Sequence, residues 1–299
     1  MLPFLRRLAL VLGLPAAACA SAPAAQAPAS TAAKPAMWKL ADADTTIYLF
    51  GTIHALPEGR HWRTPAFDRA LDRSDELVLE VADVADMAAS AAALQKLGLS
   101  PGLPPIAERV PEDKRAALRA AIAQSGIPEA VYDRLETWAA AIPILGVMFK
   151  TLGVDPELGV ERLISAPFKG GTKKVTGLET VEQQFGFFDT LSEAGQRALL
   201  VSALEDPAAA KAQLQAMLDA WSSGDVKGIE RTFDVEAQMS PELRTALLAN
   251  RNAKWAEWLA KRLDEPGTVF VAVGAGHLAG KESVLAALKA KGLQTTRVQ

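Results

Sequence analysis

Apolar residues along the chain gather into a few short runs, and most of the remaining sequence has helical spacing. The runs Thr45–Phe50, Leu77–Val81 and Thr268–Val273 are rich in β-branched and apolar residues, a composition typical of buried strands. Lys173–Leu178 is a weaker candidate of the same kind. A helical pattern over Pro65–Arg73 separates the first two runs. This β-α-β order predicts adjacent parallel strands joined by a right-handed crossover.

The middle of the chain, residues 85–261, has a mostly helical pattern. Asp206-Pro207 and Ser240-Pro241 each resemble an N-cap followed by proline at the first helical position. The uncharged run Thr137–Phe149 is too short to cross a bilayer, and Pro143 interrupts it, so we expect a buried core helix there. The predicted fold class is α/β, with a central mixed β-sheet and a large, mostly helical middle section.

The first residues have the pattern of an export signal. Two arginines precede the apolar run Leu8–Leu14, and small residues follow it. We therefore interpret residues 1–20 as a signal peptide and expect a periplasmic or secreted protein. Cleavage after Ala20 would release a soluble protein, whereas cleavage before Cys19 would leave a lipid-anchored one. Ala16 favours the soluble form, because lipoprotein signals usually carry a larger aliphatic residue at that position.

Composition and charge indicate the domain organisation and exclude several classes of function. Residues 21–37 are rich in Ala, Pro and Ser, which predicts a flexible spacer before a single domain over residues 38–299. Lys and Arg are scattered at a net charge of -3, so we expect no nucleic-acid partner. Cys19 is the only cysteine, which excludes thiolate metal ligands and cysteine nucleophiles from the domain. We predict no transmembrane segment in the mature domain, and nothing in the sequence selects an oligomeric state.

Two of the three histidines follow a strand and a glycine in the same local frame. Gly51 lies three residues before His54, and Gly274 lies three residues before His277. Glycine permits a sharp turn and a close approach of the backbone. Since ligands bind at the carboxyl ends of strands in open α/β sheets, we expect His54 and His277 to share a site. The third histidine, His61, lies in a polar loop and is interpreted as solvated.

Glu80 is a carboxylate inside the apolar run Leu77–Val81. A buried carboxylate needs a cation, a hydrogen-bond donor or a proton. Together with His54 and His277 it would form a plausible site for zinc, manganese or iron that activates a water molecule. In the alternative interpretation, Glu80 forms a salt bridge with a core arginine and the repeated glycine–histidine pattern is a coincidence.

Further candidate residues have equally plausible structural interpretations. Glu179 ends the Lys173–Leu178 run and Glu182 follows it, so either could orient a ligand or act as a general base. Both could equally form a solvated helix start. Arg251 is a candidate for binding an anionic group or intermediate, or for a structural ion pair. Trp255 is interpreted as a helix-packing residue.

Five segments together resemble the TraB/PrgY/GumN family, which is related to the Tiki metalloproteases and more distantly to erythromycin-esterase-like and ChaN-like proteins. The resemblance covers residues 38–298. The segments are Ile47-Tyr48-Leu49-Phe50-Gly51-Thr52-Ile53-His54, Leu77-Val78-Leu79-Glu80-Val81, Lys174-Val175-Thr176-Gly177-Leu178-Glu179-Thr180-Val181-Glu182-Gln183-Gln184, Arg251-Asn252 with Trp255, and Val273-Gly274-Ala275-Gly276-His277-Leu278-Ala279-Gly280.

The resemblance implies that His54, His277 and Glu80 form a metal-dependent hydrolytic centre. Tiki-like members are proteases, so a peptide or protein is the expected substrate. Glu179 or Glu182 would assist proton transfer and Arg251 would steady the substrate. The competing hypothesis is an exported binding protein that holds a metal or a metal-bearing small ligand without turnover.

Overall fold

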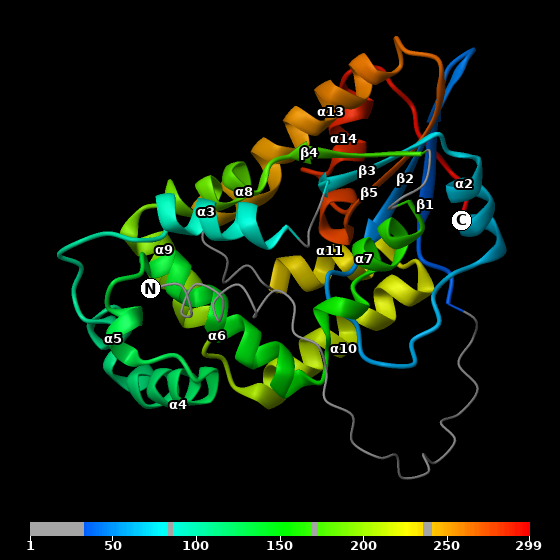
Figure 1. Ribbon diagram of the computed structural model, residues 1–299. Helices are drawn as coiled ribbons and strands as arrows, with labels where there is room; N and C mark the ends of the chain where they lie inside the picture. Colours follow the sequence, from blue (N-terminus) through cyan, green and yellow to red (C-terminus); the bar gives the residue numbers. More distant parts are fainter. Residues whose placement is uncertain (1–32, 83–85, 169–172, 236–240) are drawn as a thin grey trace, which may run out of the picture.

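A computed structural model describes residues 33–82, 86–168, 173–235 and 241–299 (Figure 1). The predicted signal peptide and most of the predicted spacer lie outside these residues. The structure has one six-stranded sheet in the order β4-β3-β5-β2-β1-β6. Its strands are β1 (Met37–Ala41), β2 (Thr45–Thr52), β3 (Glu76–Val81), β4 (Lys174–Glu179), β5 (Gly267–Gly274) and β6 (Thr296–Arg297).

The sheet is mixed, as the sequence predicts. Strands β4, β3, β5 and β2 run parallel, and β1 pairs antiparallel with both β2 and β6. The expectation that the first two predicted strands are neighbours is wrong, because β5 lies between β2 and β3. Strand β5 is apolar and buried on both faces over Phe270–Val273, which suits it to the centre of the sheet. Its insertion brings the carboxyl ends of β2, β5 and β3 side by side.

Helices cover both faces of the sheet, and strand alternation assigns residues to each face. Val269 and Val271 of β5 join Ile47 and Leu49 of β2 in the core beneath α13 (Asn250–Arg262) and α14 (Val284–Ala290). Phe270 points the other way, into the core beneath α2 (Pro65–Arg73), α7 (Val160–Ser165), α10 (Pro207–Ser223) and α11 (Val226–Val235).

A separate apolar core holds the helical middle section together. Its buried residues include Leu118, Tyr132, Trp138 and Leu200. They come from α4 (Arg115–Ser125), α5 (Glu129–Tyr132), α6 (Thr137–Leu152) and α9 (Glu193–Ser202), which gather at one end of the molecule in Figure 1. The other α-helices in the described residues are α3 (Met87–Leu97), α8 (Val181–Asp189) and α12 (Pro241–Arg244), the last continuing through the π-helical turn Thr245–Ala249 into α13.

Local sequence signals locate several helix ends. Asp206 caps α10 by accepting from the backbone N–H groups of Ala208 and Ala209. The uncharged run expected to form a core helix is α6, and Pro143 lies inside it, buried.

No helix in the described part of the chain has both the length and the apolar character that a membrane crossing requires.

Candidate functional site

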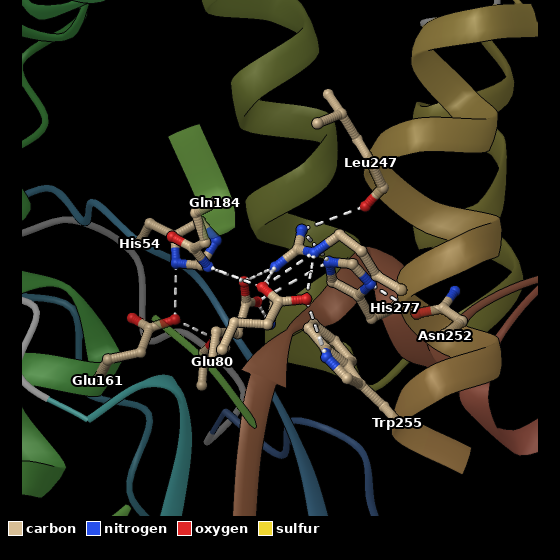
Figure 2. A network of polar contacts seen from close by, with 12 residues as sticks. His54, Glu80, Glu161, Gln184, Leu247, Asn252, Trp255 and His277 are labelled. Carbon is tan, nitrogen blue, oxygen red and sulfur yellow. Dashed lines mark hydrogen bonds and ion pairs between the residues drawn. The ribbon is translucent and has the colours of Figure 1, made fainter. Parts of the chain in front are cut away.

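Polar side chains converge at the carboxyl ends of β2, β3, β4 and β5, where Figure 2 shows His54, Glu80 and His277 in one network. Glu80 shares the parity of Val78 on β3 and therefore points toward the face covered by α13. Helix α13 places Arg251 opposite it, and Nη2 of Arg251 lies 2.6 Å from Oε2 of Glu80. The predicted alternative of a salt bridge from Glu80 to a core arginine is therefore what the structure contains.

Arg251 has an acceptor for each of its five guanidinium N–H donors. Nε and Nη2 bind Glu179 at 2.9 and 2.8 Å, and Nη2 also binds Glu80. Nη1 lies 3.1 Å from the carbonyl oxygen of Leu247 and 3.3 Å from Nε2 of His277. In this arrangement no N–H group of Arg251 is left for a substrate.

Aromatic rings and two carboxylates hold this guanidinium in place. It lies 4.7 Å from the ring centre of Trp255 and 5.4 Å from that of Phe187. Although burial opposes its charge, the bonds to Glu179 and the charge of Glu80 raise the pKa of Arg251 above its ordinary value. Arg251 is therefore the resident cation of the site, and it makes the ion pairs that were one of its two sequence interpretations.

His277 is buried and held in one orientation. Its Nδ1 lies 2.6 Å from Oδ1 of Asn252, whose amide nitrogen donates to the carbonyl oxygen of Glu282 at 2.7 Å. Because that second bond assigns Oδ1 as the acceptor, Nδ1 of His277 carries the proton and Nε2 accepts from Arg251. Burial, with the charge of Arg251, lowers the pKa of His277 to about 3, so this imidazole is neutral at pH 7.

Glu80 is ionised and bonded at both oxygens. Oε1 accepts from the backbone N–H of Gly274 at 2.8 Å and lies 3.8 Å from Nε2 of His277. Burial alone would raise the pKa of Glu80, but the neighbouring positive charges and the Gly274 N–H lower it to about 2. Since His277 is neutral near pH 7, Arg251 and His54 are the groups that supply this positive charge there.

His54 is the exposed member of the cluster. Its side chain is 65% exposed, and its Nδ1 lies 2.7 Å from Oε1 of Glu161, a carboxylate at the start of α7 that is only 6% exposed. Oε1 of Glu161 also accepts a hydrogen bond from the hydroxyl of Thr52. The Glu161 charge raises the pKa of His54 to about 9, and solvent at this exposed ring partly screens that charge.

Two glycines permit the close approach of the site residues. A Cβ atom on Gly274 would lie 3.1 Å from Nε2 of His54 and 3.3 Å from Oε1 of Glu80. One on Gly159 would lie 2.3 Å from the carbonyl oxygen of His54. The absence of a side chain at Gly274 therefore creates the space that His54 and Glu80 share, whereas Gly159 lets α7 approach the chain that follows β2.

The remaining predicted residues divide into two groups. Glu179 lies inside the network, accepts from the indole N–H of Trp255 at 3.0 Å and contacts Gln184 at 3.3 Å. Glu182 lies outside it on an exposed surface, 2.5 Å from Nζ of Lys96. His61 is exposed in its loop, as expected.

The sequence interpretation missed three members of the network. Trp255, which we interpreted as a packing residue, also binds Glu179, and its ring centre lies 4.4 Å from that of His277. Gln184 donates to Glu80 at 3.2 Å. Glu161 follows Gly159-Val160 and has no strand or histidine near it in sequence that would have indicated a role.

The expected metal ligands do not form a metal-binding cluster in this arrangement. Among the described residues, no group of three His, Asp, Glu or Cys side chains is placed to hold an ion. The guanidinium of Arg251 binds both Glu80 and Nε2 of His277, two of the three expected ligands. His54 would have to lose its proton before its Nε2 could bind a metal. A metal at these three residues would therefore require Arg251 to move.

Comparison with known proteins identifies the family. The model of the TraB/PrgY/gumN family matches residues 36–297, which include every site residue described above. The chain belongs to the TraB/PrgY/gumN family. An uncharacterized protein of Treponema pallidum (strain Nichols) is 22% identical to this family member over 265 residues, covering 83% of this chain and 78% of the other. No solved structure matches the chain.

Proposed function

We propose that this TraB/PrgY/gumN family member is a hydrolase that acts on a peptide or protein substrate, with His54 as the group that activates water. The observation that carries the proposal is an exposed imidazole beside a buried network whose charges are already paired. Nε2 of His54 lies on the same side of Gly274 as Oε1 of Glu80, so the two groups face a common space. General-base hydrolysis requires a base whose acceptor nitrogen is accessible to water and whose charged neighbours are held in place.

In the proposed reaction, neutral His54 accepts a proton from water at Nε2 while the water oxygen bonds to the carbonyl carbon. The C–N bond then breaks, and the leaving nitrogen takes the proton from His54. Arg251 keeps Glu80 ionised and in place, and does not contact the substrate. This gives Arg251 a different role from the substrate-steadying one that we expected from the sequence.

Dependence on a divalent metal, which the resemblance implies, is the alternative proposal to this metal-free reaction. Zinc, manganese or iron would bind His54, Glu80 and His277 only after the guanidinium leaves Glu80 and His277. We likewise propose export, on the signal-like pattern of residues 1–20, with a lipid anchor at Cys19 as the alternative.

The test is cleavage of a peptide library by the purified chain, followed by mass spectrometry, after chelation and after loading with zinc, manganese or iron. The proposal expects cleavage that persists after chelation. Cleavage only in a loaded sample would support a metal-dependent hydrolase with a rearranged Arg251. Stoichiometric metal binding without any cleavage would contradict the hydrolase proposal and favour the exported binding protein.

A further inference from the structure

Glu161 is a buried carboxylate that the sequence did not indicate, and its position is fixed by the backbone. The segment before α7 docks along the chain that follows β2. Leu56 and Asp155 exchange two backbone hydrogen bonds, at 3.2 and 3.0 Å, and the N–H of Val160 donates to the carbonyl oxygen of Ile53 at 3.0 Å. These bonds place the first turn of α7 against His54.

The segment before α7 packs tightly against His54. Gly159 packs so closely against the carbonyl oxygen of His54 that a Cβ atom there would overlap it. This packing places Oε1 of Glu161 at 2.7 Å from Nδ1 of His54. The hydroxyl of Thr52, from the end of β2, donates to the same oxygen and helps to hold the carboxylate in place.

We propose that Glu161, held by Thr52, is a positioning residue that keeps the proton of neutral His54 on Nδ1 and leaves Nε2 as the acceptor. A carboxylate can only accept a hydrogen bond, so a neutral imidazole beside it must donate from Nδ1. Orientation of a base by a third group is a general requirement of such sites. The inference rests on the proposed function for its catalytic consequence, although the tautomer itself does not depend on it.

The tautomer is measurable because the chain has only three histidines. The experiment is a long-range 1H–15N spectrum of the histidine rings in the full chain, recorded over a pH series up to the point where the His54 signals stop shifting and the ring is therefore neutral. A His54→Asn variant assigns the ring of interest. The ring of His277, whose Nδ1 binds Asn252, serves as an internal report on the integrity of the network.

The proposal expects the Nδ1–H tautomer of His54 in the wild type. In Glu161→Gln the amide can donate to Nδ1, so the Nε2–H tautomer of His54 should rise while the His277 signals stay in place. Glu157→Gln is the matched control, because Glu157 pairs with Arg162 and should leave His54 unchanged. An unchanged His54 tautomer in folded Glu161→Gln overturns the proposal. A wild-type Nε2–H tautomer overturns it without any variant.

A kinetic measurement separates this inference from the proposed function. With a peptide from the library screen, and with each protein measured at a pH where its own His54 is neutral, Glu161→Gln should lower kcat by roughly 10²- to 10⁴-fold and leave KM nearly unchanged, because only the base is affected. A wild type with the Nδ1–H tautomer but no cleavage would support the positioning role and contradict the hydrolase. Cleavage that Glu161→Gln leaves unchanged would support the hydrolase and overturn the positioning role.

Discussion

The two histidines of the site differ in protonation because their surroundings differ. His54 is exposed and lies next to the Glu161 carboxylate, which raises its pKa to about 9. His277 is buried beside Arg251, and its pKa falls to about 3. The same Gly-x-x-His pattern therefore gives one titrating group that faces solvent and one acceptor that is neutral at pH 7. The sequence showed the repeated pattern, but it could not show this difference, because Glu161 and Arg251 come from distant segments.

The pH dependence of hydrolysis tests the role of His54. A base is active only when it is neutral, so kcat/KM should rise with pH until about pH 9. Replacing Glu161 by Gln removes the charge that raises the pKa of His54, and the rise should then occur at lower pH, toward the ordinary value of 6.5. A pH–rate profile of both proteins checks this. Identical profiles would contradict the assignment of His54 as the base.

Removal of Arg251 should cost stability, because it leaves Glu80 and Glu179 without their cation. We expect Arg251→Met to lower the free energy of unfolding by about 3–5 kcal/mol, as for other broken buried ion pairs. Lys96→Met breaks the exposed pair with Glu182 and should cost less than about 1 kcal/mol. Urea denaturation of both variants checks the difference. Equal losses would show that the buried ion pairs of Arg251 contribute no more to stability than the exposed pair.

At the scale of elements, four strand ends and three helices build the site. Short apolar runs identified the strand that carries Glu80 and the two strands that lead to His54 and His277, since a strand is a local pattern. The neighbour relation of β2 and β3 could not be read in the same way, because β5 enters between them from the far end of the chain. The docking of α7 on the end of β2 was unpredictable for the same reason.

The close contact at Gly274 gives a prediction at this scale. A methyl group at this position would lie against His54 and Glu80, so Gly274→Ala should displace one of them and lower kcat by at least about tenfold. Gly186 on α8 has nothing within 4 Å of the corresponding position, and Gly186→Ala is the matched control that should keep full activity. Steady-state rates of both variants test this prediction. Full activity of Gly274→Ala would show that the two groups need not share this space.

At the scale of the whole molecule, the α/β class and the helical middle section followed from the sequence pattern. The sheet has a separate core on each face, and the middle helices have a third. Alternating apolar residues in β2 and β5 account for the first two. The assembly of the polar network was not predictable in detail, because it joins four strand ends with side chains from α7, α8 and α13, which only the tertiary fold brings together.

Buried charge predicts an acid-sensitive fold. The pKa of His277 is lower in the folded state than its ordinary value of 6.5, so its contribution to stability is complete above pH 6.5 and is lost as the pH falls toward 3. Glu80 adds a further loss below its ordinary pKa of 4.5. The His277 loss is on the order of 5 kcal/mol at most. Urea denaturation from pH 7 to pH 4 should show the decline, and His277→Asn should flatten it. A pH-independent wild type would contradict the assignment of His277 as neutral.

The role of His54 as the base is tested by the rate of peptide cleavage by three proteins under one condition: the wild type, His54→Asn and His61→Asn. His61 is the matched control, since it is an exposed histidine outside the network. We predict that His54→Asn loses at least about 10²-fold in kcat/KM and that His61→Asn keeps the wild-type rate. Equal cleavage by the wild type and a folded His54→Asn variant would contradict the account.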